Sequence, residues 1–399
     1  MKVYIQQLVA PAYRNDFFAA IQERSDYHVE VHASQNAINQ PASIAADEAK
    51  FRLEFHPCRS LASGRLYWQS AMAIPKSFHK GDVLVFNSNP RILSNFVLLL
   101  SAKLRGCKIV SWNHFMSSSS GALSSRIRKA MTKLVSDHYF VYVQGEANQM
   151  ESLGYDRSRI TALGNTINTA NVREACHCWS SGDQASLPNN DLVQALRQRK
   201  SERLRKFAED NSLADSFNLL FCGRITKKTR LNILLEGFAS FRTSAARKTK
   251  LIIIGDGEEQ AYGRQLAKKL DIESAVLWVG AVFDEVDLAP WFLNADLFVY
   301  PGAIGLSLNH AMAYGLPVVT HDNPANQMPE FFYLKEGENG FLFQEENADS
   351  LTKKLLEAMG HDQLEVVSSN ASRQIMEKYT FDNMVNNFIS GLSSLENQS

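Results

Sequence analysis

Short apolar runs alternate with helical patterns along the first half of the chain. Four apolar runs have the length and composition of strands, and they cover residues 1–9, 81–89, 106–115 and 138–145. Between the second and third run, residues 92–105 show the apolar spacing of a helix. Strands that are separated by helices predict βαβ units, and therefore a parallel sheet.

The same alternation restarts in the second half. Strands are predicted at 217–224, 250–259, 275–282, 296–301 and 316–321, with helices at 230–241 and 261–270. Residues 175–215 lack this alternation, because a polar stretch there precedes one charged helix. We therefore predict the α/β class, with two doubly wound Rossmann-like domains that face a cleft. The predicted boundaries are an N-terminal domain 1–174, a connector 175–215, a C-terminal domain 216–375 and a helix 376–399 that returns to the N-terminal domain.

Composition and charge narrow the function classes. The chain has 42 Lys+Arg and 42 Asp+Glu residues, so it lacks the basic excess that is typical of nucleic-acid binding. Gln6 and Gln7 interrupt the apolar start, which argues against a signal peptide, and no apolar run is long enough to span a bilayer. We expect a cytoplasmic protein, either free or peripheral on the inner face of the membrane.

Cysteine and histidine residues predict neither a disulfide framework nor a metal site. The five cysteines are sparse and odd in number, in a chain of 399 residues. Cys176, His177 and Cys178 are too closely spaced for the usual zinc geometry, and no matching pair follows them. No metal and no cofactor are therefore predicted.

Three strand ends in the second half suit phosphate binding. In open α/β sheets ligands bind beyond the carboxyl ends of the strands. The first end carries Gly223 and Arg224, and after them Lys227, Lys228 and Arg230. Arg can hydrogen-bond a phosphate with two N–H groups at once, although a solvated basic loop is the alternative.

The other two strand ends are glycine turns. Gly255 and Gly257 lie between an apolar strand and a helix, where an ordinary βα turn is the alternative to anion binding. Gly302 and Gly305 precede a helix that is predicted to begin near Leu306 or Ser307. The unpaired amides of that first turn would favour a diphosphate.

The order and spacing of these segments resemble the retaining glycosyltransferases of family 4, which have the GT-B fold. The resemblance covers about residues 140–390 and includes "IIIGDGEE", "NADLFVYP", "GLSLNHAMAYGLPVV" and "GENGFLF". The start of the chain, "APAYRNDFF", is similar to some bacterial polysaccharide-assembly transferases. The resemblance implies a glycosyltransferase that takes its sugar from a nucleotide diphosphate sugar.

The resemblance also implies roles for single residues. The family has two glutamates eight positions apart, one near the donor sugar and one near the ribose, and this chain has Gly302 and His310 there. We expect His310 to take the ribose-side role and Gly302 to leave room near the sugar. The family's phosphate clamp corresponds to Arg224 and to Lys228, which is off by one position, so that Arg230 is the alternative.

The resemblance implies roles for further residues. The phosphate contacts of the family's helix correspond to Gly305, Leu306 and Ser307. His114, just past a strand, is expected near the donor sugar, and Arg14 on the acceptor side; a structural histidine is the alternative for His114.

The expected reaction is transfer of a sugar to a glycan or lipid-linked acceptor, with retention of configuration. A nucleotide-sugar epimerase and a catalytically silent nucleotide-binding partner are the alternatives, because both glutamates are replaced. Residues 124–135, with Arg126, Arg128, Lys129 and Lys133, have the pattern of a basic amphipathic helix. Such a helix can lie on anionic membrane, and a solvated helix packed on the first domain is the alternative.

Overall fold

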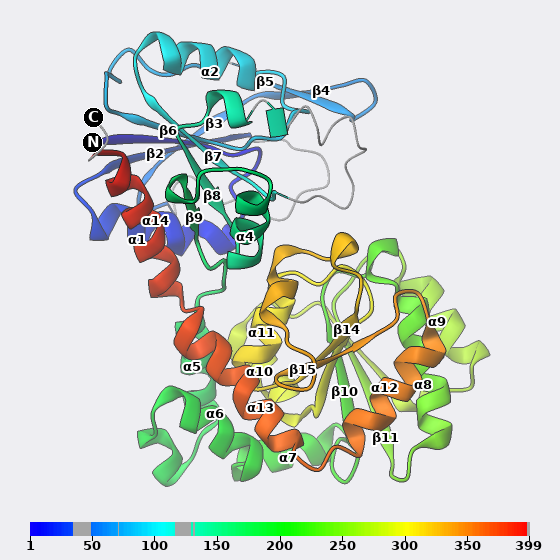
Figure 1. Ribbon diagram of the computed structural model, residues 1–399. Helices are drawn as coiled ribbons and strands as arrows, with labels where there is room; N and C mark the ends of the chain where they lie inside the picture. The colour runs from blue at the N-terminus through cyan, green and yellow to red at the C-terminus, as the bar shows by residue number, and fades with distance from the viewer. Residues whose placement is uncertain (35–48, 71, 116–128, 131, 397–399) are drawn as a thin grey trace. The chain divides into compact units, whose positions relative to one another are not determined.

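The computed structural model of the protein describes residues 1–34, 49–70, 72–115, 129–130 and 132–396, and it divides into two units (Figure 1). The first unit comprises Met1–Asn165 together with Phe381–Ser399, and the second comprises Thr166–Thr380. Each unit has its own parallel sheet and its own hydrophobic core. Among the described residues, no helix is both long and apolar enough to cross a membrane.

The first unit is built on a seven-stranded sheet with the order β3-β2-β1-β6-β7-β8-β9. Its strands are β1 (Lys2–Gln6), β2 (His28–Ser34), β3 (Arg52–His56), β6 (Val83–Phe86), β7 (Lys108–Trp112), β8 (His138–Val141) and β9 (Ile160–Ala162), and β4 (Cys58–Leu61) and β5 (Leu66–Gln69) form a separate antiparallel pair. The four strands that the sequence predicts here, β1, β6, β7 and β8, are confirmed. The pattern missed β2 and β3 because polar side chains occupy one face of both strands.

The last helix of the chain packs on the first unit. Helices of this unit with described bounds include α1 (Asn15–Arg24), α2 (Asn95–Leu104), α4 (Gln144–Ser152) and α14 (Phe381–Glu396). Phe388 of α14 contacts Phe17 of α1 and Phe140 of β8, at ring-centroid distances of 5.4 and 4.7 Å. In Figure 1 α14 lies beside α1. A side chain at Gly391 would lie 2.4 Å from Phe140, so glycine permits this close contact.

The second unit is built on a six-stranded sheet with the order β12-β11-β10-β13-β14-β15. Its strands are β10 (Phe217–Cys222), β11 (Thr249–Ile254), β12 (Val276–Gly280), β13 (Leu297–Tyr300), β14 (Val318–His321) and β15 (Gly340–Phe343). Its main helices are α8 (Leu231–Ser244), α9 (Gln260–Lys269), α10 (Glu285–Asn294), α11 (Leu306–Ala313), α12 (Ala348–Met359) and α13 (Leu364–Arg373). Two parallel α/β sheets confirm the predicted fold class.

The residues predicted as a connector, 175–215, form part of the second unit. They run through the end of α5 (Thr169–Trp179), then α6 (Asn189–Gln198) and α7 (Glu202–Asp210). These helices are rich in charged residues, but they also carry an apolar stripe. Leu192, Leu196 and Leu204 on this stripe are fully buried. Such a stripe packs a helix onto its own domain, so the boundary between the units falls at residue 165 and not at 174.

Candidate functional site

The predicted phosphate turns meet at one edge of the second sheet. Gly223 follows β10, Gly255 follows β11, and Gly302 follows β13 by two residues. These three strands are direct neighbours and parallel, in the order β11-β10-β13, so their carboxyl ends lie together. The structure therefore brings the three turns to one place.

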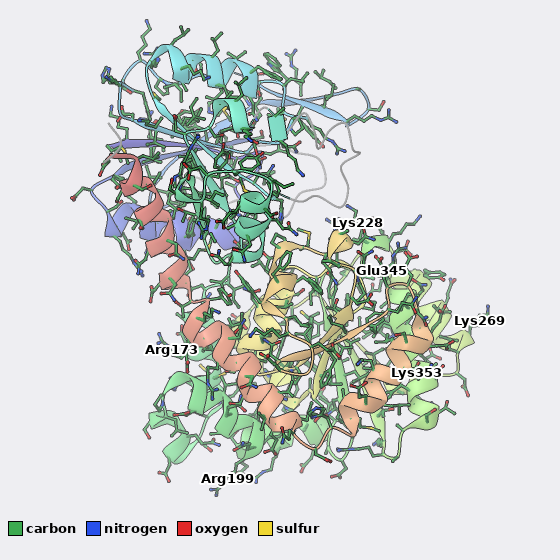
Figure 2. The ribbon with its side chains drawn as sticks, in the orientation of Figure 1. Arg173, Arg199, Lys228, Lys269, Glu345 and Lys353 are labelled. Carbon is green, nitrogen blue, oxygen red and sulfur yellow. The ribbon has the colours of Figure 1, made fainter. Side chains whose placement is uncertain are left out.

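Arg224 and Lys228 are two exposed cations at this edge. Both side chains are exposed, and Lys228 projects from the second unit in Figure 2. Within the described part of the chain, neither side chain makes a hydrogen bond or an ion pair. Lys228 belongs to a short 3-10 turn, Lys227–Thr229, that Thr226 and Thr229 close with reciprocal hydrogen bonds. An unpaired guanidinium and ammonium group at a sheet edge suit a phosphate ligand.

Gly255 and Gly257 are required by the packing of two loops. An added Cβ at Gly255 would lie 1.9 Å from the Gly223 carbonyl oxygen, and one at Gly257 would lie 2.1 Å from that of Ile225. Their φ angles, +133° and +156°, are also strained for other residues. The loop after β11 thus lies directly against the loop after β10. This packing accounts for both glycines, and direct contact of either one with a donor remains a prediction.

The helix α11 begins where the sequence predicts, at Leu306. Gly305 precedes it and offers no side-chain cap to the first amides, so those of Leu306 and Ser307 are available to a ligand. The turn before the helix is held in place by Gln327. Its Oε1 accepts a hydrogen bond from the Ile304 amide at 2.7 Å, and its Nε2 donates to Thr320 at 3.0 Å.

Gly302 packs directly against the backbone of the 227–229 turn, and the expectation that it leaves room near the donor sugar remains a prediction. A Cβ at this position would lie 2.1 Å from the carbonyl oxygen of Lys228 and 2.8 Å from Thr229 Cα. The backbone of the 227–229 turn fills the space where a side chain would start. A glutamate could not replace Gly302 without moving that turn, so the turn and the glycine belong together.

Arg230 is engaged within the protein. It adopts the left-handed conformation, with φ of +55°, immediately before α8. Its guanidinium forms an ion pair with Glu346. Arg230 is thus a weaker candidate for the phosphate clamp than Lys228, which carries no such partner in the described chain.

His310 forms a hydrogen-bonded group with Glu285 and Tyr314. His310 Nε2 lies 2.7 Å from Glu285 Oε1, and the Tyr314 hydroxyl donates to the same oxygen at 2.6 Å. The His310 ring also packs on Phe292 at a centroid distance of 4.6 Å. Burial favours the neutral acid, yet His310 and the Tyr314 hydroxyl outweigh it and hold the pKa of Glu285 below its ordinary value. The carboxylate is therefore ionised near neutral pH.

These contacts fix what His310 and Glu285 can offer a ligand. Because a carboxylate cannot donate, His310 must donate its Nε2–H to Glu285. With its proton on Nε2, the imidazole has an acceptor at Nδ1, and Glu285 keeps Oε2. No hydrogen bond to either atom occurs among the residues that the structure describes. The pair thus presents two acceptor atoms, as the two oxygens of one glutamate would.

Arg14 lies inside the first unit, near the ends of β1, β7 and β8. Only 5% of it is exposed. Its guanidinium stacks on Trp112 at 4.2 Å and donates to the Tyr142 hydroxyl at 3.2 Å. Nη1 is buried without a hydrogen-bond partner in the described chain. The guanidinium thus faces aromatic rings, and its acceptor-side role remains a prediction.

His114 is partly exposed and lies beside Glu146. Its ring is 4.6 Å from the Tyr142 ring, and its Nδ1 is 3.6 Å from Glu146 Oε1. Glu146 itself is buried and accepts the amides of Phe115 and Tyr142, so it orders the loops after β7 and β8. A cavity of about 20 Å³ beside His114 is suited to a single water rather than to a sugar. His114 thus lies beside a buried carboxylate, and a donor-side role remains a prediction.

Sequence analysis missed Glu285 and Gln327. Glu285 follows Asp284, which caps α10 by accepting the Val286 amide at 2.8 Å, and an acid at this position is typical of helix starts. Gln327 lies in a loop with no repeating pattern. Of these two residues, only Glu285 has a sequence signal, which is its position at a helix start. That signal indicates helix capping and not ligand binding. Half of the predicted basic helix 124–135, namely residues 124–128 and 131 with Arg126 and Arg128, lies outside the described residues.

Comparison with known proteins shows which class of protein this chain resembles. Residues 216–361 match the family described as Glycosyl transferases group 1. An uncharacterized glycosyltransferase of Haemophilus influenzae is 30% identical over 139 residues, which cover 34% of this chain and 37% of the relative. The lipopolysaccharide 1,2-N-acetylglucosaminetransferase of Salmonella typhimurium is 23% identical over 216 residues, or 51% and 54% of the two chains. The chain thus spans less than two thirds of the length of these relatives.

Solved structures match both units. Anabaena HepE in complex with UDP has a TM-score of 0.70 at 15% identity, over 98% of this chain and 99% of HepE. Sucrose-phosphate synthase of Thermosynechococcus elongatus has a TM-score of 0.66 at 14% identity, over 100% of both chains. The two parallel sheets and these likenesses define the GT-B fold. Within that fold, residues 216–361 form the domain that matches the group 1 glycosyl transferases.

Proposed function

We propose that the protein is a glycosyltransferase that moves a sugar from a nucleotide diphosphate sugar to a glycan or lipid-linked acceptor, with retention. The observation that carries this proposal is the edge of the second sheet. There, the exposed Arg224, unpaired in the described chain, follows β10, and the uncapped start of α11 follows the neighbouring strand β13. The group 1 match covers the same segment.

The chemistry needs charge stabilisation more than a protein nucleophile. As the bond between sugar and diphosphate breaks, negative charge grows on the diphosphate. Arg224, Lys228 and the amides of Leu306 and Ser307 would stabilise that charge. The leaving diphosphate can then take the proton of the acceptor hydroxyl. Under this mechanism the glutamate that is absent at position 302 is not required.

We also propose that this chain belongs to a branch of the family that replaced the paired glutamates. His310 Nδ1 and Glu285 Oε2 would accept hydrogen bonds from the two ribose hydroxyls. The hydrogen bond of 2.7 Å between the two side chains supports this assignment, because it leaves one acceptor free on each of them. The carboxylate is thus supplied from α10 instead of α11.

A panel of nucleotide sugars tests the proposed function. UDP-glucose and UDP-N-acetylglucosamine come first, because the HepE structures contain UDP and UDP-glucose and the Salmonella relative is named for N-acetylglucosamine. GDP- and dTDP-sugars complete the panel. Sugar transfer or slow release of the nucleoside diphosphate would support the transferase. An isomerised donor would indicate an epimerase, and binding without any turnover would indicate a silent partner.

We expect the His310→Ala variant to bind a ribonucleoside diphosphate less tightly than the wild type does. Its affinity for the 2′-deoxy analogue should fall by less. The expected gap between the two losses is about 1 kcal/mol, the usual net value of one hydrogen bond. Glu285→Gln should produce a similar gap, because an amide presents a donor where a carboxylate accepts. Calorimetric titration with UDP and 2′-deoxy-UDP measures both.

The exposed His177 provides a control in the same unit, and His177→Ala should change neither affinity. If His310 only packs on Phe292 and holds Glu285, its loss would lower the melting temperature and weaken both ligands equally. That result would assign His310 a structural role.

A further inference from the structure

Polar side chains fill one face of the first sheet where β2 and β3 pair. The register sets Glu30 opposite Arg52, His32 opposite Glu54, and Ser34 opposite His56. All six side chains lie on the same face, since residues two apart on a strand share a face. Glu30 and His32 are almost completely buried, at 1% and 2% exposure. Burial of such groups is costly unless they are paired or bind a metal.

Three ligand atoms converge on this face. His32 Nδ1 lies 2.9 Å from His56 Nε2 and 3.7 Å from Glu54 Oε2, and all three atoms lie within 4.8 Å of one another. Tyr4 stacks on the His32 ring at 3.8 Å and restricts its rotation. Arg52 Nε donates to the other oxygen of Glu54, Oε1, at 2.9 Å, so Oε2 is the oxygen that faces the histidines.

A buried carboxylate faces the second nitrogen of His32. Glu30 Oε2 lies 3.5 Å from His32 Nε2, and neither atom has a hydrogen-bond partner within the described chain. Arg52 holds Glu30 through its other oxygen, at 2.9 Å. A carboxylate in this position favours a proton on Nε2 and directs the lone pair of Nδ1 toward His56 and Glu54. Histidines that bind metals are usually oriented by such a partner.

We propose that His32 Nδ1, His56 Nε2 and Glu54 Oε2 bind a zinc ion. Imidazole nitrogen and carboxylate oxygen are both zinc ligands, and water can take the fourth position. Two imidazoles on a tetrahedral zinc, with bonds of 2.0–2.1 Å, hold their nitrogens about 3.3 Å apart. The His32 and His56 nitrogens need to separate by only about 0.4 Å to reach this, and Glu54 Oε2 needs to approach His32 Nδ1 by about the same distance.

A zinc ion at this site would link the edge strand β3 to the neighbouring strand β2. β3 is the last strand on its side of the sheet, and it contributes two ligands while β2 contributes one. Zinc would thus hold an edge strand by side chains as well as by backbone hydrogen bonds. The competing arrangement is metal-free, with His56 Nε2–H donating to His32 Nδ1. It explains the distance of 2.9 Å equally well, but it leaves Glu54 Oε2 and Glu30 Oε2 without a clear role.

Metal titration of the full chain distinguishes the two arrangements. The protein, without an affinity tag and stripped by a chelator, is titrated with Zn²⁺ by calorimetry, and with Co²⁺ by visible absorption. We expect one zinc per chain, a tetrahedral cobalt spectrum and a higher melting temperature with zinc. Mg²⁺ should produce none of these effects, because it prefers oxygen ligands in octahedral geometry.

Two variants locate the metal. His56→Ala should weaken zinc binding more than about 100-fold, beyond the loss typical of a partner that only orients a ligand. Glu54→Gln, on a half-exposed side chain, tests the site without removing a ring, and should also weaken binding and abolish the effect on melting. His177→Ala is the control and removes a histidine between two cysteines on α5. Absence of one-to-one zinc binding, unchanged affinity in both site variants, or loss of binding in His177→Ala would overturn the proposal.

Discussion

Replacing Gly255 with alanine is expected to lower the free energy of unfolding of the second unit by about 2–6 kcal/mol. The φ angle of +133° is one that residues with a side chain rarely adopt, which costs about 1–3 kcal/mol. The new Cβ would also lie 1.9 Å from the Gly223 carbonyl oxygen. Relief of that overlap requires the loops after β10 and β11 to separate, at about 1–3 kcal/mol more.

Calorimetric melting measures this effect, because it can resolve separate transitions for the two units. Gly360→Ala is the matched control in the same unit. Gly360 has no positive φ, and its nearest neighbour would be 3.5 Å away from an added Cβ, which is ordinary contact. That variant should be neutral or slightly stabilising. A Gly255→Ala protein that melts like the Gly360→Ala protein would show that the two loops are not in tight contact.

The sequence predicts the sheets well where apolar runs are pure. β6, β7, β10 and β11 are buried over most of their length and were visible through short runs of Val, Ile, Leu and Phe. β2 was missed although it is equally buried, because His28, Glu30 and His32 alternate with apolar residues. A polar buried face cannot be told from a solvated one by periodicity alone, since both have a period of two.

The site was predictable only in its backbone. Glycines and a helix start leave a local signal, so the turns at Gly223, Gly255 and Gly305 could be placed from sequence. Side-chain partners leave none when they are distant in the chain. Glu285 is 25 residues from His310, and the 227–229 turn is far in sequence from Gly302, whose space it fills. These contacts depend on which strands become neighbours, and the sequence pattern does not specify that order.

The packing around Gly302 restricts which residues could replace it. A simple deletion of a side chain would leave a void, and a void could be refilled by restoring the residue. Here the backbone at Lys228 and Thr229 lies 2.1 and 2.8 Å from the place of the missing Cβ. The same turn carries Lys228, which is predicted for the phosphate clamp. A larger residue at position 302 would therefore require a different backbone path for the 227–229 turn.

Arg224→Ala is expected to weaken the binding of a nucleoside diphosphate by about 1.5–3 kcal/mol, the range for hydrogen bonds to a charged group. The dissociation constant for UDP would then rise roughly tenfold to a hundredfold or more. The reason is that Arg224 is exposed and unpaired in the described chain, so its guanidinium is available to a diphosphate at the sheet edge. Because the side chain has no internal partner to lose, the melting temperature should stay nearly unchanged.

Calorimetric titration with UDP measures the loss, and Arg242→Ala provides the matched control. Arg242 is exposed like Arg224, but it lies in the last turn of α8, about 18 Å along the helix from Arg230 at the site end. Removing it subtracts the same charge from the same unit without touching the proposed phosphate site. Equal losses in the two variants would mean that only the overall positive charge attracts the ligand. An Arg224→Ala protein that is folded and binds UDP as the wild type does would remove Arg224 from the site.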